Sequence, residues 1–316
     1  MEQRILGNSG IPVSAIGLGC MSMTAAYDLD AIDEAESLRA IHRAIDLGIT
    51  FIDTADVYGP HTNEVLVGRA LKDRRDEVVL STKCGYLKFP DGSMARDGRP
   101  EHLRAGIDGS LQRLGVDHVD LWQLHRVDPN VPVEESWAVF AEAAQAGKTR
   151  AVGLSEATLD EVKRCHAIHP VASVQSELSL WTREWLDELI PWLAENDIAF
   201  IAFSPLGRGF LTGALTPDRT FAPEDTRAAM PRFQAEALAA NQRLIDTLKE
   251  IAARHGATVP QVAIAWVLSR GRHVIPIPGT RRTSRVEENA GAADVVLSPE
   301  DLAALDALPP AEGTRY

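Results

Sequence analysis

The chain has 316 residues, of which 45% are hydrophobic and 24% charged, an ordinary balance for a soluble globular protein. Its net charge of −13 argues against general binding to nucleic acid or to an anionic membrane surface. The apolar runs are too short to cross a bilayer, and the first ten residues lack the features of a signal peptide. Cys20, Cys84 and Cys165 have no metal-ligand spacing and favour a reducing compartment. We therefore expect a cytoplasmic protein without a metal site.

Short apolar runs alternate with amphipathic segments along almost the whole chain. A turn at Asn8, Ser9 and Gly10 predicts an N-terminal β-hairpin. Eight strands are then expected at residues 15–18, 51–53, 78–83, 119–124, 151–154, 172–175, 198–203 and 274–277. Helical patterns cover residues 35–47, 63–72, 100–114, 132–146, 158–168, 183–195, 231–255 and 284–292. A further helix is expected within 256–271, and another, followed by an exposed end, after residue 297.

Eight alternations of strand and helix imply parallel strands, because parallel neighbours need a long connection and a helix usually provides it. Closing the strands gives a (β/α)8 (TIM) barrel, and an open doubly wound sheet is the alternative. The barrel is favoured because chemistry-bearing residues follow strands two to five, and a barrel gathers those strand ends on one face. We expect a single α/β barrel domain over residues 1–316, with the hairpin closing its bottom and extra C-terminal helices. Residues 204–229 form a long loop of the kind that is functional or disordered.

Four polar side chains stand just past the ends of apolar, strand-like runs. They are Asp53 and Tyr58 in FIDTADVYG, Lys83 in VVLSTKCG and His125 in VDLWQLHR. Carbonyl reduction needs a proton donor beside a hydride source, and a free phenol, with a pKa of about 10, is a poor acid near neutral pH. An ammonium nearby favours the phenolate, a carboxylate holds that ammonium, and an imidazole orients the substrate oxygen. The set favours an oxidoreductase; Asp56 is expected to be more exposed and is left outside the site.

Seven stretches identify a family resemblance: FIDTADVYG, STKCG, DLWQLHRVD, VGLSE, VQSELSLW, FSPLGRGFLTG and IPGTRRTSRVEENAG. In this order they resemble the aldo-keto reductases, and most closely the branch that contains pyridoxal and perakine reductase-like enzymes. The resemblance implies NADPH-dependent reduction of an aldehyde or ketone to an alcohol, with Tyr58 as the general acid. It also implies cofactor binding without a Rossmann domain, and no strand here is followed by a G-x-G-x-x-G motif that opens a helix.

The resemblance places a cofactor site at the later strand ends. Ser155, Glu156 and Gln175 align with residues that hold the nicotinamide carboxamide. Glu156 stands where many relatives have Asn, and an ionised carboxylate cannot donate a hydrogen bond to the carboxamide oxygen. A supporting role or a role at the start of a helix is therefore the alternative for Glu156. Phe203 would pack against the nicotinamide ring or belong to the core. Residues expected near the pyrophosphate are Ser204, Leu206, Gly207 and Gly209.

Residues after the last strand are expected to bind the adenosine end. Arg281 and Arg285 would meet its 2′-phosphate, Glu288 and Asn289 would meet the adenine, and Gly279 and Thr280 precede them. Many relatives have Lys in place of Gly279. Arginines that follow a Pro-Gly turn in an otherwise acidic protein suggest a phosphate site at a helix start, and therefore NADPH rather than NADH.

The expected partner is a small-molecule carbonyl substrate. Apolar side chains that would line its pocket, and that favour an aromatic or medium-sized aldehyde, are Met21, Met23, Tyr27, Tyr86, Leu87 and Trp181. Two other functions stay open. One is a Schiff-base lyase that uses Lys83 as its nucleophile, and the other is a non-enzymatic, nicotinamide-sensing regulatory subunit. The sequence leaves the oligomeric state open.

Overall fold

Eight parallel strands form the centre of the protein in a computed structural model that describes residues 1–89 and 93–315. They neighbour one another in the order β12-β11-β10-β9-β8-β5-β4-β3. Their bounds are β3 Leu18–Gly19, β4 Phe51–Asp53, β5 Val79–Cys84, β8 Val119–Leu124, β9 Thr149–Ser155, β10 Ser173–Glu177, β11 Ala199–Phe203 and β12 Val274–Pro276. The two edges meet, because the Gly17 amide donates to the Pro276 carbonyl at 2.9 Å and Gly19 forms a parallel bridge with Gly279. The predicted barrel is confirmed.

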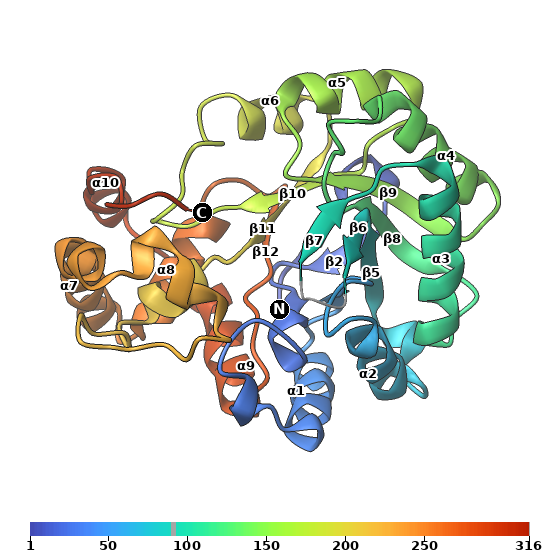
Figure 1. The fold of residues 1–316 in the computed structure, drawn as a ribbon. Coiled ribbons are helices and arrows are strands. Elements are labelled where there is room, and N and C mark those ends of the chain that lie inside the picture. The colour runs from blue at the N-terminus through green and yellow to red at the C-terminus, as the bar shows by residue number, and fades with distance from the viewer. Residues whose placement is uncertain (90–92, 316) are drawn as a thin grey trace.

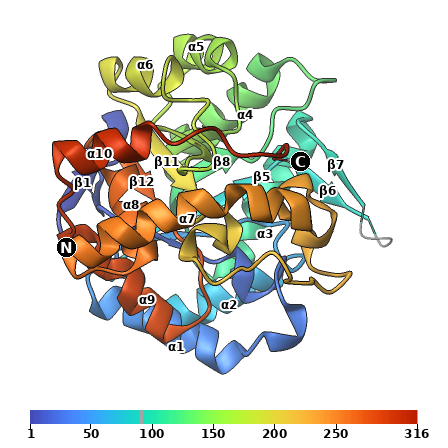
Figure 2. The same ribbon diagram turned by 90° about the vertical axis from the view of Figure 1, so that its left-hand side faces the viewer.

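Helices surround these strands: Figure 1 looks nearly along the barrel axis, and Figure 2 shows the barrel from the side. Around the barrel (Figure 1) the helices are α1 Glu34–Asp46, α2 Thr62–Leu71, α3 Pro100–Leu114, α4 Val133–Gln145, α5 Leu159–Ile168, α6 Leu189–Glu195, α7 Ala235–His255, α8 Val259–Leu268, α9 Thr283–Ala290 and α10 Pro299–Asp306. The prediction for residues 183–195 was too long, since α6 begins only at Leu189. Pro191 lies in its first turn, where a missing N–H is tolerated, and residues 184–188 form turns instead.

The N-terminal hairpin, β1 Gln3–Ile5 paired with β2 Pro12–Ser14, lies at the bottom of the barrel. Its buried side chains Leu6, Ile11 and Val13 share one apolar cluster with the first inward residues of the strands, including Phe51 and Leu121. A second hairpin, β6 Tyr86–Lys88 and β7 Met94–Arg96, follows β5 directly. This second hairpin was not predicted, because its three-residue strands are too short to give a clear sequence pattern.

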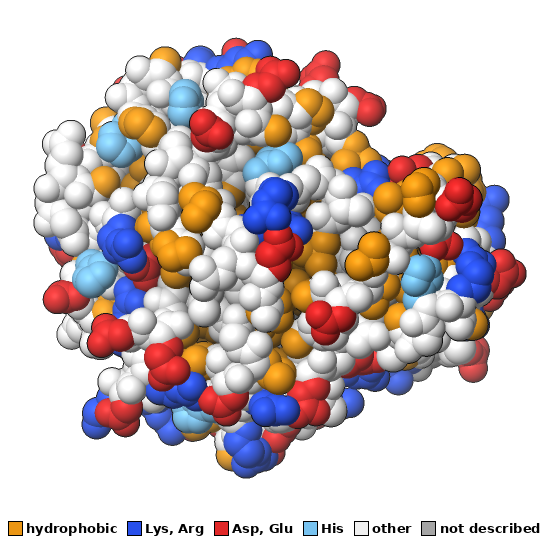
Figure 3. Space-filling model, turned by 180° about the vertical axis from the view of Figure 1, so that it is seen from behind, with side chains coloured by type: hydrophobic (Ala, Val, Ile, Leu, Met, Phe, Trp, Pro, Cys, Tyr) orange, Lys and Arg blue, Asp and Glu red, His pale blue; other side chains and the backbone are white. Residues whose placement is uncertain are grey.

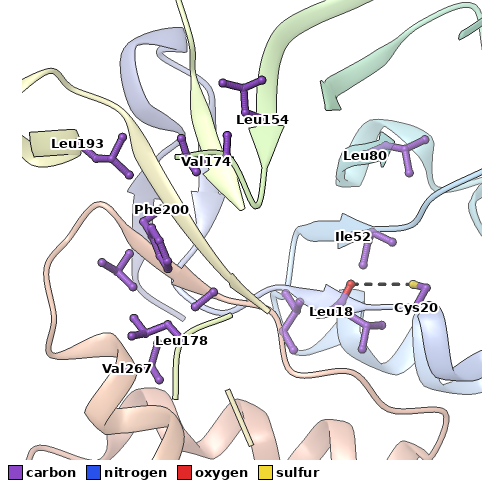
Figure 4. Packing of buried hydrophobic residues seen from close by; sticks show 14 of the residues in the cluster. Leu18, Cys20, Ile52, Leu80, Leu154, Val174, Leu178, Leu193, Phe200 and Val267 are labelled. Atoms are coloured by element: carbon purple, nitrogen blue, oxygen red, sulfur yellow. Dashed lines mark hydrogen bonds between the residues drawn. The ribbon is translucent and has the colours of Figure 1, made fainter. Parts of the chain in front are cut away.

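Alternate strand residues belong to two separate apolar clusters. Phe51 and Val79 belong to the inner cluster, whereas their neighbours Ile52 and Leu80 pack in the outer cluster under the helices. Figure 4 shows this outer layer, with side chains from several strands directed toward the helical shell. Because successive side chains of a strand point to opposite faces, a closed barrel must sort residues in this way.

The surface mixes charges of both signs. On the face shown in Figure 3, acidic and basic side chains are interleaved among polar and apolar ones. Within residues 1–89 and 93–315, no helix has both the length and the hydropathy needed to span a membrane.

The hairpin plug generates a stability prediction. Leu6→Ala removes a fully buried side chain from the inner cluster and should lower the free energy of unfolding by about 2–5 kcal/mol. Ile5→Ala, one residue earlier on the exposed face, should change it by about 0.5 kcal/mol or less. Urea denaturation followed by circular dichroism measures both. Equal effects of the two substitutions would show that the hairpin does not seal the barrel.

Candidate active site

The inward positions of five neighbouring strands change from mostly apolar to polar toward the carboxyl ends. From the bottom of the barrel upward they are Phe51 and Asp53 on β4; Val79, Ser81 and Lys83 on β5; Leu121 and Gln123 on β8, followed by His125; Ala151, Gly153 and Ser155 on β9; and Ser173, Gln175 and Glu177 on β10. The apolar lower layer excludes water, and the layers above it present side chains that can do chemistry. In (β/α)8 enzymes the active site is built at this end of the barrel.

A buried ion pair lies at the centre of the upper layers. The Lys83 ammonium is 2.5 Å from Asp53 Oδ2 and donates a second hydrogen bond to the Thr54 carbonyl at 2.7 Å. The other Asp53 oxygen accepts from Ser81 at 3.0 Å and from Gln175 at 3.0 Å. Burial lowers the pKa of Lys83, but the charge of Asp53 and the contact with Tyr58 outweigh it, so the net shift is upward. Lys83 is therefore held as an ammonium.

Tyr58 lies beside this ammonium in the loop that follows β4. The Lys83 nitrogen is 5.2 Å from the centroid of the phenol ring. The loop is fixed from both ends, because the Asp56 amide donates to the Lys83 carbonyl and the Asn63 amide donates to the Tyr58 carbonyl. Burial raises the pKa of Tyr58, and the nearby charge of Lys83 only partly offsets it. The ammonium therefore acts in the direction that the sequence predicted, while the phenol still keeps its proton at neutral pH.

His125 completes the group as a neutral imidazole. It follows β8, and its ring is 5.7 Å from the Tyr58 ring and 5.0 Å from the Tyr86 ring, both edge to face. Burial, with added repulsion from Arg126 and Lys83, holds the pKa of His125 well below its usual value. Its Nδ1 atom is buried without a hydrogen-bond partner among the described residues. The structure thus brings the four predicted side chains together at one end of the barrel.

Two of the predicted carboxamide-binding residues face each other across neighbouring strands. Ser155 on β9 and Gln175 on β10 are register partners, and both are buried. The Gln175 nitrogen donates to Asp53, so its carbonyl oxygen is the atom left to accept a hydrogen bond. Ser155 Oγ accepts from Arg126 at 3.1 Å, so its hydroxyl hydrogen is left to donate. One donor and one acceptor at the same level match the needs of a primary amide.

Glu156 has a different set of partners from the one expected. The residue adopts a left-handed conformation with φ of 52°, and its carboxylate accepts from the Glu177 amide at 3.1 Å. It also pairs with Arg315 near the C-terminal end of the described chain. Arg208 pairs with the fully buried Glu177 at 2.7 Å. These contacts support the alternative role for Glu156. The tail is exposed at residues 312–314, as predicted, while the side chain of Arg315 packs against the barrel.

The segment after β11 turns back sharply where a pyrophosphate was expected. Ser204, Gly207, Arg208 and Gly209 all have positive φ, and residues Gly207–Thr212 form a kinked 3-10 segment rather than an unstructured loop. Phe203 is half-buried at the end of β11, and Leu206 is half-buried beside the outer cluster. The Gly207 and Gly209 amides already donate to the carbonyls of Ser204 and Leu206, so a pyrophosphate would have to meet other amides of this turn.

The predicted adenosine site is only partly free to bind. Arg281 donates to the carbonyls of Ser22, Tyr27 and Asp28 at 2.8–3.1 Å, so its guanidinium ties two loops together. Arg285 is exposed and forms an ion pair with Glu288. The remaining predicted residues already contact other parts of the protein. Gly279 forms a bridge with Gly19 that leaves little room for a Cβ. The Thr280 hydroxyl accepts from the Arg282 amide, and Asn289 is buried.

The expected substrate-lining residues divide into two groups. Met21, Tyr27, Tyr86 and Leu87 are half-buried around the carboxyl end of the barrel. Met23 and Trp181 are instead buried in the outer cluster, and the Trp181 ring stacks on Phe210 at a centroid distance of 4.3 Å. The structure does not bring Trp181 to the others, because its faces are already covered by protein.

Asp56 is buried, and the expectation that it is more exposed is wrong. It is 4% exposed and lines a cavity of about 250 Å³ together with Tyr86, His102 and Gly106. Its Oδ1 atom has no hydrogen-bond partner among the described residues. Burial, reinforced by the charge of Glu64, raises the pKa of Asp56 to about 7. The carboxyl is therefore partly protonated near neutral pH.

Comparisons with known proteins identify relatives of this chain. Residues 15–309 match the model of the Aldo/keto reductase family. A probable aldo-keto reductase 1 from Glycine max is 43% identical over 300 residues, covering 94% of this chain and 86% of that protein. The glycerol dehydrogenase AKR11B4 from Gluconobacter oxydans superposes with a TM-score of 0.85 at 31% identity, over 96% of this chain and 93% of that one.

A second solved structure adds a ligand to the comparison. It is an aldo/keto reductase from Klebsiella pneumoniae in complex with NADP and acetate, with a TM-score of 0.76 at 28% identity, over 100% of this chain and 99% of that one. The fold and the site thus define an NAD(P)H-dependent oxidoreductase of the barrel type. The chain belongs to the aldo/keto reductase family.

Sequence reasoning missed several polar residues of the site. Ser81 and Gln123 contact Asp53 or each other, and Glu177 anchors Arg208. Each of the three lies two residues from a predicted site residue: Ser81 from Lys83, Gln123 from His125 and Glu177 from Gln175. Because every second residue of a strand faces the same side, this spacing would have revealed them. Arg126, which directly follows His125, donates to Ser155 and was also not predicted as a site residue.

The buried Asp56 generates a prediction about pH and stability. Its folded-state pKa of about 7 lies above the ordinary value near 4, so unfolding releases a proton between these values. The free energy of unfolding should therefore fall by up to about 1.4 kcal/mol per pH unit as the pH rises through this range. Asp56→Asn should remove this contribution, whereas Asp73→Asn, at an exposed position, should leave it. Urea titrations from pH 4.5 to 8 give the slopes, and an unchanged slope in Asp56→Asn would contradict the assignment.

Proposed function

We propose that this protein reduces aldehydes or ketones to alcohols with NADPH, with Tyr58 as the general acid. The observation that carries the proposal is the contact between a protonated phenol and a buried ammonium that Asp53 fixes in place. A bound nicotinamide cofactor supplies the hydride. The protein then has to provide the proton, orient the carbonyl and stabilise the charge that develops on oxygen.

Each side chain has a defined task in this mechanism. Tyr58 donates its proton to the carbonyl oxygen, and Lys83 stabilises the phenolate that remains. Asp53 holds Lys83 at 2.5 Å, and its two other close donors keep the carboxylate fixed. His125 is neutral and can donate one hydrogen bond to the same carbonyl oxygen without competing as a stronger acid.

The nicotinamide end fits the polar atoms at the mouth of the barrel. In the proposed arrangement, Ser155 donates to the carboxamide oxygen and Gln175 accepts from its nitrogen. Glu156 supports the turn after β9 and is not required to contact the cofactor. Phe203 and the segment from Ser204 to Gly209 would hold the ring and the pyrophosphate.

Neither alternative function gains support from the geometry. A Schiff-base lyase needs a neutral amine, but the raised pKa of Lys83 and its ion pair with Asp53 keep this amine protonated. A purely regulatory subunit does not need a phenol, an ammonium and an imidazole converging on one point. These features favour turnover.

The acid role of Tyr58 predicts a separation between chemistry and binding. Tyr58→Phe removes only the hydroxyl and should lower kcat for aldehyde reduction by about 10²- to 10⁴-fold. Its Kd for NADPH, measured by fluorescence titration, should stay within about threefold of the wild-type value. NADPH oxidation at 340 nm with a panel of aldehydes measures the first effect. Turnover retained in Tyr58→Phe would contradict the proposal.

The choice between NADPH and NADH is proposed to depend on two arginines, Arg281 just before α9 and Arg285 within it. Arg281 is already bound to three carbonyls, so Arg285 is the predicted residue that is better placed to meet a 2′-phosphate. Arg285→Gln should weaken NADPH binding by about tenfold or more and leave NADH binding unchanged. Arg43→Gln is the matched control, because Arg43 on α1 forms an ion pair with Glu287, which lies on α9 as Arg285 does. Equal wild-type affinities for NADPH and NADH would remove the phosphate site.

A further inference from the structure

Arg126 is a cation beside the reactive group whose one task so far is to donate a hydrogen bond to Ser155. It follows His125 at the end of β8, and its side chain is half-buried. One guanidinium nitrogen, Nη1, donates to the His125 carbonyl at 2.6 Å and to Ser155 Oγ at 3.1 Å. The guanidinium also lies 5.9 Å from the centroid of the Tyr86 ring. These contacts fix its plane and direction.

Within the described part of the chain, the hydrogen bonds of this guanidinium are the two made by Nη1. Among the described residues, Arg126 forms no ion pair, and its Nε and Nη2 atoms have no acceptor. Other cations at this end of the barrel differ: Lys83 pairs with Asp53, Arg208 with Glu177 and Arg315 with Glu156. A half-buried cation without a counter-ion is costly in free energy, and it is most easily tolerated where a ligand supplies the missing charge.

The position of Arg126 relates this free side to the reacting carbonyl. The Tyr86 ring contacts both the guanidinium of Arg126 and the imidazole of His125. The charge of Arg126 is also felt at Tyr58 and at His125, because it lowers the pKa of both groups. The guanidinium therefore lies beside the Tyr86 and His125 side chains, next to the space in which a substrate would meet Tyr58.

We propose that Arg126 binds a carboxylate carried by the substrate, so that the enzyme acts preferentially on aldehydes or ketones that are also carboxylic acids. This inference rests on the proposed function and names its substrate class. A guanidinium offers parallel N–H donors that match the two oxygens of a carboxylate, and such charge-assisted pairs are the strong hydrogen bonds of proteins. Because the net charge of −13 repels anions overall, binding of a carboxylate here would depend on this local contact with Arg126.

The test compares two substrates that differ only in charge. They are 4-carboxybenzaldehyde and its methyl ester, both reduced with NADPH by the wild type, Arg126→Gln, Arg126→Lys and the control Arg96→Gln. Arg96 is an exposed arginine on neighbouring β7. We expect wild-type kcat/KM to favour the acid by about tenfold or more, and Arg126→Gln to lose about 10- to 100-fold on the acid but less than about threefold on the ester. Arg126→Lys should recover part of the loss, and Arg96→Gln should match the wild type.

Other outcomes separate the inference from the function on which it rests. An equal fall in kcat/KM for the acid and the ester in Arg126→Gln would overturn the inference. It would show that Arg126 acts by positioning Ser155 and His125. Good reduction of the ester without preference for the acid would overturn the inference and leave the proposed function standing. Failure of the wild type to reduce either compound, or any carbonyl in the panel, would remove both.

A binding measurement without turnover completes the test. Benzoate at millimolar concentration should raise the Tm of the wild type and of Arg96→Gln, whereas benzamide, its neutral analogue, should not. Arg126→Gln should lose the response to benzoate while keeping a baseline Tm close to that of the wild type. An equal shift by benzoate in Arg126→Gln would show that the carboxylate binds elsewhere and would overturn the inference.

Discussion

The buried pair of Lys83 and Asp53 is the constraint on which the rest of the site depends. Two charges without access to water are expensive, and their attraction compensates only when the geometry is good and the remaining hydrogen-bonding atoms are satisfied. Here the Asp53 carboxylate also accepts from Ser81 and Gln175, and Lys83 donates to the Thr54 carbonyl. The strands that carry these residues must therefore stay in register. A barrel provides this because each strand is fixed on both sides.

The same pair explains why the phenol can serve as an acid. Burial alone would keep Tyr58 protonated and make its phenolate very costly. The ammonium reduces that cost without itself becoming the proton donor, because Asp53 raises the pKa of Lys83. Burial also holds His125 neutral, so it cannot add a second positive charge beside Lys83. The three pKa shifts together support the proposed role of Tyr58 as the proton donor.

Much of the barrel could be predicted from the sequence, because it depends on local patterns. Apolar runs of strand length alternate with helical segments, and Asp53, Lys83 and His125 lie where those runs end. The side-chain partners of the outer residues could not be predicted in the same way. Arg281 binds carbonyls some 250 residues earlier in the chain, and Glu156 pairs with Arg315 from the tail. Such partners depend on how distant loops fold over the barrel, which periodicity does not encode.

Asp56 and Arg126 show the same limit within a few residues of the predicted site. Asp56 is only two residues from Tyr58, yet its burial depends on β6 and α3, which form the cavity around it. Arg126 directly follows the predicted site residue His125. Its proposed role depends on its lack of a carboxylate partner among the described residues, which only the folded structure shows. An arginine in a sequence is usually a solvated surface residue. Next to the Lys83–Asp53 pair, whose charges balance, an arginine without an ion-pair partner among the described residues adds a local positive charge, and such a charge would favour an anionic substrate over a neutral one of the same shape.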